Sequence, residues 1–330
     1  MEQLQNFQTA LANTEAAKTL NVYGAQFLTY VYPEMDYTQS PNAGLPFMVF
    51  HEAVLVIAVY LFLVSFGYLI MRSYSANKNL KSLVALYNLT QVICCGYLVV
   101  ETIRTAIALD YTPICNTFDP AVTNNKMPFL LYLFYMTKGL DLFDTLFFVA
   151  HKSDRQISFL HVYHHVSIFM VYWVNSNIFY SGDIYYTIIA NGFVHFVMYG
   201  YYFLTTVNST GKETKNTVYQ FTQALRPYIT TLQLFQFVTM MSQAGYILYK
   251  SCGSPLISTK IYFFYILSMF ALFMQFFIAN YFKPKKGDKS KKLKKKSSEP
   301  TRKSKRIMEK TDRHAAAEKD ALDAKDKKKK

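Results

Sequence analysis

ISFLHVYHHVSIFMVYWV, residues 157–174, is the stretch that decides the fold of this chain. The run is long and apolar enough to predict a membrane-crossing helix, yet it carries His161, His164 and His165. At spacings of i, i+3 and i+4 the three imidazoles share one side of that helix. Ionisable side chains at membrane depth are costly and usually line a pathway or a reaction site. The run therefore predicts a histidine cluster that faces a cavity, and a hydrogen-bonded packing network is the alternative.

Six further apolar runs of spanning length accompany this one, in a chain that is 52% hydrophobic with 28 Phe and 27 Tyr. They cover residues 53–71, 82–105, 128–150, 184–206, 228–249 and 260–282. We therefore expect an all-α polytopic membrane protein with seven transmembrane helices. Its predicted parts are a lumenal N-terminal segment suited to the membrane interface (1–46), the helical membrane domain (47–282) and a basic disordered tail (283–330).

The distribution of charge predicts the orientation of the helices. Most of the formal net charge of +14 belongs to residues 283–330, so it gives no sign of a nucleic-acid-binding face. The first, third and fifth loops and the tail are basic, and by the positive-inside rule they face the cytosol. The N-terminus then faces the opposite side of the membrane. The sequons at Asn88 and Asn208 fall within a helix and on the cytosolic side, so neither should be glycosylated.

The four cysteines, Cys94, Cys95, Cys115 and Cys252, show no C-x-x-C spacing. Two of them lie inside an apolar run. The sequence therefore predicts neither a disulfide framework nor a zinc site.

Polar residues of six predicted helices lie at a similar depth, roughly 8 to 16 Å from the cytosolic surface at 1.5 Å per residue. Asp141 and Asp144 are level with His161 and His164 across a short hairpin connection. The other residues at this level are Asn88, Gln91, Asn191, His195, Gln233, Gln236 and Gln275. A polar chamber continued by apolar helices suits a substrate with a polar head and a long hydrocarbon tail.

Four motifs in this order resemble those of the ELO family of very-long-chain fatty acid elongases. They are KGLDLFDT (138–145), HVYHH (161–165), NGFVHFVMYGYY (191–202) and TTLQLFQF (230–237). One position departs from the family pattern, because Asp141 stands where the family has Glu. The resemblance implies seven helices, six of them enclosing an acyl-chain tunnel, in the endoplasmic reticulum membrane. It also implies a 3-ketoacyl-CoA synthase that condenses long-chain acyl-CoA with malonyl-CoA, and Val162 and Tyr163 favour the polyunsaturated-chain elongases.

On this reading the histidine box supplies the nucleophile, because an imidazole can accept an acyl group from a thioester. We choose His164, with His165 second, and expect His195 or a second histidine of the box to handle the thiol and malonyl ends. Asp141 and Asp144 would orient imidazoles, and Lys138 would balance their charge. The expected oxyanion donors are Asn191, Gln233 and Gln236. Candidate partners for CoA phosphates are Lys152, Arg155, Lys212, Lys215 and Arg226.

We expect no bound cofactor and no metal, with acyl-CoA and malonyl-CoA as substrates. The other expected partners are the lipid bilayer and the ketoacyl reductase, dehydratase and enoyl reductase of the elongation cycle; a homo-oligomer is left open. A di-iron desaturase or hydroxylase needs about eight histidines in several boxes, more than the seven present. A seven-helix transporter or receptor is the other alternative. The terminal lysines, including Lys327 and Lys328, fit either a retrieval signal or a tail that binds anionic lipid.

Overall fold

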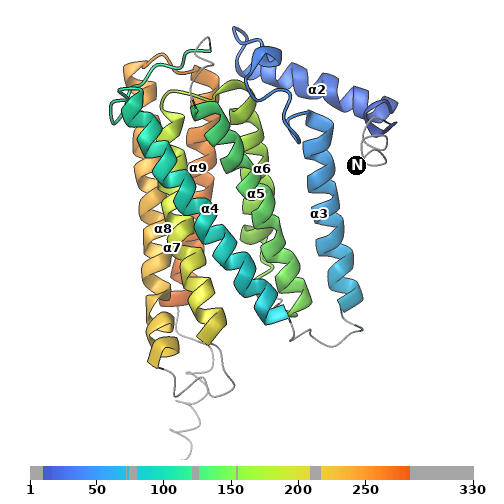
Figure 1. The fold of residues 1–330 in the computed structure, drawn as a ribbon, viewed down its shortest axis with the longest axis vertical. Helices are drawn as coiled ribbons and strands as arrows, with labels where there is room; N and C mark the ends of the chain where they lie inside the picture. The colour runs from blue at the N-terminus through green and yellow to red at the C-terminus, as the bar shows by residue number, and fades with distance from the viewer. Residues whose placement is uncertain are drawn as a thin grey trace, which may run out of the picture. The chain divides into compact units, whose positions relative to one another are not determined.

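The computed structural model describes residues 10–71, 73, 80–120, 126–153, 155–208 and 217–282. In these ranges the chain is helical and contains no strand, which confirms the all-α fold class (Figure 1). The helices are α2 (Glu15–Val31), η1 (Tyr37–Gln39), α3 (Phe50–Met71), α4 (Lys81–Ala108), α5 (Met127–Ala150), α6 (Phe159–Ile178), α7 (Ile184–Asn208), α8 (Thr217–Lys250), α9 (Leu256–Phe277) and η4 (Ile278–Phe282). The chain divides into two compact units, 1–277 and 278–330, and of the second only the π-helical turn η4 is described. The predicted tail therefore lies outside the described residues.

Each of the seven predicted apolar runs corresponds to one long helix, α3 to α9. The predicted and observed ends differ most at α8, for which the sequence predicts a start at residue 228. The helix begins at Thr217 and continues through Pro227, so its polar first turns are helical as well. Hydropathy alone marks the apolar part of a helix and not its polar extension.

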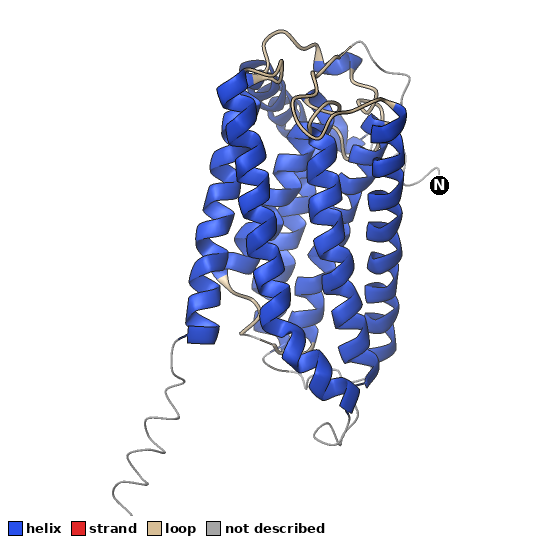
Figure 2. Cartoon of the chain, turned by 90° about the vertical axis from the view of Figure 1, so that its left-hand side faces the viewer, coloured by secondary structure: helices blue, strands red, loops and turns tan. Residues whose placement is uncertain are grey.

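The helices of residues 81–277 pack in a defined order. Each helix contacts the next in the order α4, α5, α6, α9, α8, α7. The last of these, α7, contacts α4 again, so the six helices form a closed ring of contacts. Figure 2 shows these long helices running alongside one another. Helix α3 is not one of these six helices; it packs against α5 and α6. Helix α2 packs against α3.

Helix α2 runs across the direction of α3 rather than along it (Figure 1). Thr14 caps its N-terminus, with its Oγ1 accepting a hydrogen bond from the backbone N–H of Ala17 at 3.2 Å. A Cβ atom placed on Gly24 would lie 2.5 Å from the Cβ of Phe50. Glycine therefore allows α2 to approach the first turn of α3 this closely.

Among the residues that the structure describes, three helices are long and apolar enough to cross a membrane: Phe50–Met71, Lys81–Ala108 and Leu256–Phe282. Helix α5 does not qualify, because Lys138, Asp141 and Asp144 fall in every 18-residue window of it. Helices α6, α7 and α8 likewise carry the histidines and amides singled out above. The residues that suggest a site are thus the residues that lower the hydropathy of these helices.

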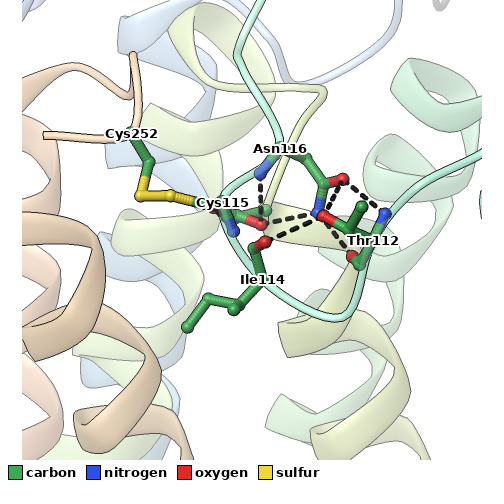
Figure 3. Close-up of a disulfide and its surroundings, with 6 residues drawn as sticks. Thr112, Ile114, Cys115, Asn116 and Cys252 are labelled. Atoms are coloured by element: carbon green, nitrogen blue, oxygen red, sulfur yellow. Dashed lines mark hydrogen bonds between the residues drawn. A yellow bond between two sulfur atoms is a disulfide. The ribbon is translucent and has the colours of Figure 1, made fainter. Parts of the chain in front are cut away.

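The prediction that the cysteines form no disulfide is wrong. Cys115, in the α4–α5 connection, is bonded to Cys252, in the α8–α9 connection, with the two Cα atoms 5.0 Å apart (Figure 3). These cysteines are 137 residues apart in the chain, and they meet because both connections lie at the same end of the helices. The sequence pattern gave no sign of this pair, since only the packing order of the helices brings the two loops together.

Asp183 holds the same end of the helices together. Its carboxylate accepts backbone hydrogen bonds from Cys115 at 3.1 Å and Asn116 at 3.0 Å, and a third from the Asn116 side chain at 2.8 Å. Burial raises the pKa of Asp183 above its usual range, and the three donors oppose that shift. The α4–α5 connection is thereby fixed to the start of α7.

Candidate active site

Helix α5 positions one stripe of charge, because Lys138, Asp141 and Asp144 recur at i, i+3 and i+6. Lys138 is buried, with 1% of its surface exposed. Its Nζ donates to Asp141 Oδ2 at 3.2 Å and to Asn191 Oδ1, on α7, at 3.0 Å. The same Nζ lies 3.5 Å from His195 Nδ1, which is 3.6 Å from Asp141 Oδ2. One ammonium and one carboxylate thus join α5 to α7 and hold the ring of His195.

The carboxylates of Asp141 and Asp144 are linked by a tyrosine. The hydroxyl of Tyr199 lies 2.9 Å from Asp141 Oδ1 and 2.7 Å from Asp144 Oδ2. Gln91, from α4, donates to Asp141 Oδ1 at 2.7 Å. Asp141 therefore reaches partners on three helices, although its side chain is one methylene shorter than the Glu of the family pattern.

The histidine box on α6 is connected to α5 through a hydroxyl. His161 Nε2 lies 2.9 Å from Thr145 Oγ1, which lies 2.9 Å from the hydroxyl of Tyr60 on α3. The rings of His161 and His165 are 4.2 Å apart. His161 is therefore the box member with a fixed hydrogen-bond partner, and His165 packs against it.

His164 and His165 differ from His161 in their hydrogen bonds. Within the described residues, the Nδ1 atoms of both rings are buried and have no hydrogen-bond partner. The ring of His164 packs edge-on against Phe273 of α9 at 6.0 Å. A buried polar atom without a partner calls for an explanation, and a reactive role is one.

The amides of α8 lie beside sulfur atoms. Gln233 Nε2 is 3.6 Å from Met198 Sδ, and Gln236 Nε2 is 3.2 Å from Met240 Sδ. A thioether is a weak acceptor. An amide held this way can turn to a stronger acceptor, such as a carbonyl oxygen. Gln275, expected at the same depth, is exposed on α9 and does not join this group.

The five basic residues proposed for CoA phosphates divide into three groups. Lys152 and Arg155 are exposed in the α5–α6 connection. Arg226 is exposed on α8, and its Nε donates to the hydroxyl of Tyr201 at 2.9 Å. Lys212 and Lys215 lie outside the described residues.

The described ranges contain no group of three or more His, Cys, Asp or Glu side chains arranged to hold a metal ion. They do contain an arrangement suited to acyl transfer. It has two imidazoles with a free Nδ1, a third imidazole held by a buried ion pair, and amides placed to donate hydrogen bonds.

Sequence reasoning overlooked four residues of this arrangement. They are Tyr60, Thr145, Tyr199 and Tyr87, whose hydroxyl lies 3.4 Å from that of Tyr199 and accepts a hydrogen bond from Gln91 Nε2 at 3.2 Å. Thr145 and Tyr199 stand inside the quoted motifs, so the motif itself was a signal for them. Tyr60 and Tyr87 belong to predominantly apolar helices, α3 and α4, where nothing in the sequence separates them from packing residues.

Residues 46–289 match the family model described as GNS1/SUR4, ELO. The chain is 31% identical over 204 residues to very long chain fatty acid elongase 2 of Mus musculus, covering 62% of this chain and 67% of the mouse protein. It is 29% identical over 212 residues to elongase 4 of Homo sapiens, with 63% and 64% covered, so this match spans just under two thirds of the human protein. It is 28% identical over 241 residues to elongase 5 of Tachysurus fulvidraco, with 71% and 76% covered.

The chain belongs to the ELO (GNS1/SUR4) family. The resemblance inferred from the four motifs is thereby confirmed. The family and its named relatives support a general function in fatty acid elongation and a place in a membrane.

Proposed function

We propose that this protein condenses long-chain acyl-CoA with malonyl-CoA to give 3-ketoacyl-CoA, carbon dioxide and CoA. The observation that carries the proposal is the free Nδ1 of His164, a buried imidazole atom in a chain of the elongase family. We propose polyunsaturated acyl chains as the substrates, because Val162 and Tyr163 inside the histidine box resemble the residues of the polyunsaturated-chain elongases.

In the first step, His164 attacks the thioester carbonyl of acyl-CoA. The carbon–sulfur bond breaks, the acyl group passes to one nitrogen of the imidazole, and the acylated ring gives up the proton of its other nitrogen. That proton passes to the thiolate by way of a nearby imidazole, for which we propose His195, and CoA leaves as the thiol. An acyl-imidazole hydrolyses readily in water, so a site from which water is largely excluded protects it.

In the second step, malonyl-CoA loses carbon dioxide and becomes an enolate. The enolate carbon attacks the acyl carbonyl, a carbon–carbon bond forms and the carbon–nitrogen bond to His164 breaks. The released imidazole takes back from solvent the proton that it gave up in the first step. Asn191 is suited to stabilising the oxyanions, because its Oδ1 accepts from Lys138 at 3.0 Å and its Nδ2 remains a donor. Gln233 and Gln236 would turn from their methionine sulfurs to the same oxygens.

We further propose that α3 to α9 all span the endoplasmic reticulum membrane, with the N-terminus lumenal and the tail cytosolic. Six of these helices would enclose the acyl chain, a proposal supported by the contact order that returns from α7 to α4. The disulfide at the end opposite the basic loops supports this orientation, since disulfides persist in the oxidising lumen.

An assay with purified protein tests the proposal directly. Acyl-CoA substrates of different length and unsaturation are mixed with labelled malonyl-CoA, and products are separated by mass. We expect labelled 3-ketoacyl-CoA two carbons longer than the substrate, without added metal or cofactor. Transport of small ligands across vesicles, with no condensation product from any acyl-CoA, would favour the transporter alternative instead.

A further inference from the structure

An apolar pocket of about 330 Å³ opens at the end of the helices where α2 lies. Its walls come from α2, α3, α6 and α9, and this volume is in the range of pockets that hold small ligands. Val31 and Trp173, each 1% exposed, form its floor. Phe27 and Ile261, 42% and 39% exposed, form its rim. The pocket is therefore open to the outside of the helices at Phe27 and Ile261.

The walls of this pocket include two candidate membrane spans. Phe50 comes from the first turn of α3, and Ile261 from α9, and both helices are long and apolar enough to cross a bilayer. A pocket between such helices, with an apolar rim, is reached from hydrocarbon more readily than from water.

Helix α2 covers the pocket and is apolar on two faces. One face, with Gly24, Leu28 and Val31, is buried against the rest of the chain. On another, Tyr23, Phe27 and Tyr30 are exposed at 62%, 42% and 69%, at spacings that align them along one side. Aromatic side chains of this kind favour the membrane–water interface, where a helix lying across the others would be placed.

We infer that this pocket holds part of one acyl chain of a bilayer glycerophospholipid, with α2 as its cover at the interface. None of the lining side chains is charged, and the polar ones are Asn175, Ser258 and Tyr262, so the pocket suits a hydrocarbon chain and has no charge to pair with an ionic headgroup, which stays in the interface beside α2. The inference does not depend on the proposed condensation reaction, because the pocket shares no residue with the candidate active site.

The single tryptophan of the chain provides the probe. Trp173 lines the pocket, and its ring is fixed by an Nε1 hydrogen bond to the Met48 carbonyl at 2.9 Å and by Phe50 at 4.9 Å. Bromine atoms quench indole fluorescence only at short range. Full-length protein is reconstituted in phosphatidylcholine with brominated acyl chains and compared with the same protein in unbrominated phosphatidylcholine. We expect the brominated lipid to remove about half of the Trp173 emission.

Two variants on α9 separate the pocket from the surrounding bilayer. Ile261→Phe narrows the rim and should restore most of the emission in brominated lipid. Leu267→Phe makes a similar change at a residue that is 41% exposed on the same helix and does not line the pocket, so it should be quenched like the unmodified protein. Ile261→Ala, which widens the rim and adds no bulk, should be quenched at least as strongly as the unmodified protein.

The inference is overturned if Ile261→Phe and Leu267→Phe are quenched equally, because bulk lipid would then account for the effect. It is also overturned if the unmodified protein is not quenched. As a second measurement, lipid extracted from protein washed in detergent should contain about one phospholipid per chain, and Ile261→Phe should lose it. Retention of a free fatty acid in place of a phospholipid would contradict the occupant that we propose.

Discussion

At the scale of single residues, hydrogen bonding divides the three histidines of the box. His161 Nε2 lies 2.9 Å from the Thr145 hydroxyl, so its orientation is set by α5. His164 and His165 have a buried Nδ1 without a partner among the described residues, and His165 is the more enclosed of the two. A nucleophile must reach the substrate and must not be committed to another bond. These contacts favour His164.

We predict that His164→Ala abolishes the first half-reaction. An acyl-enzyme mechanism releases CoA from acyl-CoA before malonyl-CoA is added, in an amount near one per site. The burst should be present in the unmodified protein and absent in His164→Ala, and peptide mapping should locate the acyl group on His164.

His151→Ala is the matched control, because His151 lies outside the box and its Nδ1 bonds to the carbonyl of Phe147 at 2.9 Å. It should keep a normal burst. A normal burst in His164→Ala, or an acyl adduct on Cys94 or Cys95, would show that our choice of nucleophile is wrong.

The buried pair of Lys138 and Asp141 should show strong coupling. Removing one partner of a buried ion pair leaves an unpaired charge and typically costs about 3–5 kcal/mol of the free energy of unfolding. We therefore expect Lys138→Met and Asp141→Asn each to lower the thermal stability strongly. The double variant should be more stable than the sum of the two losses predicts.

A double-mutant cycle from denaturation of the purified variants measures this coupling. The exposed pair of Glu101 and Arg104, 2.8 Å apart on α4, is the control and should give a coupling below about 1 kcal/mol. Additive losses at Lys138 and Asp141 would mean that their 3.2 Å contact does not stabilise the protein.

The sequence could predict which residues gather but not how they pair. The spacing of Lys138, Asp141 and Asp144 follows from helix geometry alone, and so does the stripe they form. The contact of Tyr199 with both carboxylates depends on how α5 and α7 face each other. No periodicity contains that information, and the same is true of the contact between Gln236 and Met240, which depends on a rotamer.

At the scale of helices and connections, the apolar runs predicted the seven long helices because each of these helices contains one long, continuous apolar segment. The disulfide between Cys115 and Cys252 escaped prediction for a different reason. Each cysteine lies in a connection, and which connections meet depends on the order in which helices pack. Asp183 is similar, since its three donors come from a loop about 67 residues earlier in the chain.

We predict that the unreduced, denatured protein exposes two reactive thiols and the reduced protein four. Cys94 and Cys95 are the free cysteines of the structure. Replacing both Cys115 and Cys252 by Ser should lower the free energy of unfolding by about 2–5 kcal/mol, because the bond no longer restricts the unfolded chain. Thiol labelling with mass analysis and thermal denaturation measure the two effects.

The matched control replaces Cys94 and Cys95 by Ser, which should leave the thermal response to reductant unchanged. Four reactive thiols before reduction would mean that Cys115 and Cys252 are not bonded in the isolated protein.

At the scale of the whole molecule, two features point to the same orientation in the membrane. The exposed Lys152 and Arg155 lie in the α5–α6 connection, and basic loops favour the cytosol. The Cys115–Cys252 disulfide ties connections at the other ends of the helices, and disulfides favour the lumen. The basic connection reflects the energy of moving charge across a membrane, whereas the disulfide reflects the redox state of the compartment. The two arguments for the orientation are therefore independent.

We therefore predict that a glycosylation sequon added at the N-terminus is modified in microsomes, and that the same sequon added after the final residue is not. The chain carries its own controls in Asn208, at the basic end of α7, and Asn88, which is 3% exposed within α4. The unmodified protein should show no glycan, and the N-terminal variant should gain one that an endoglycosidase removes. Modification of Asn208 or of the C-terminal sequon would reverse the orientation, and it would place the histidine box near the lumenal side, away from cytosolic malonyl-CoA.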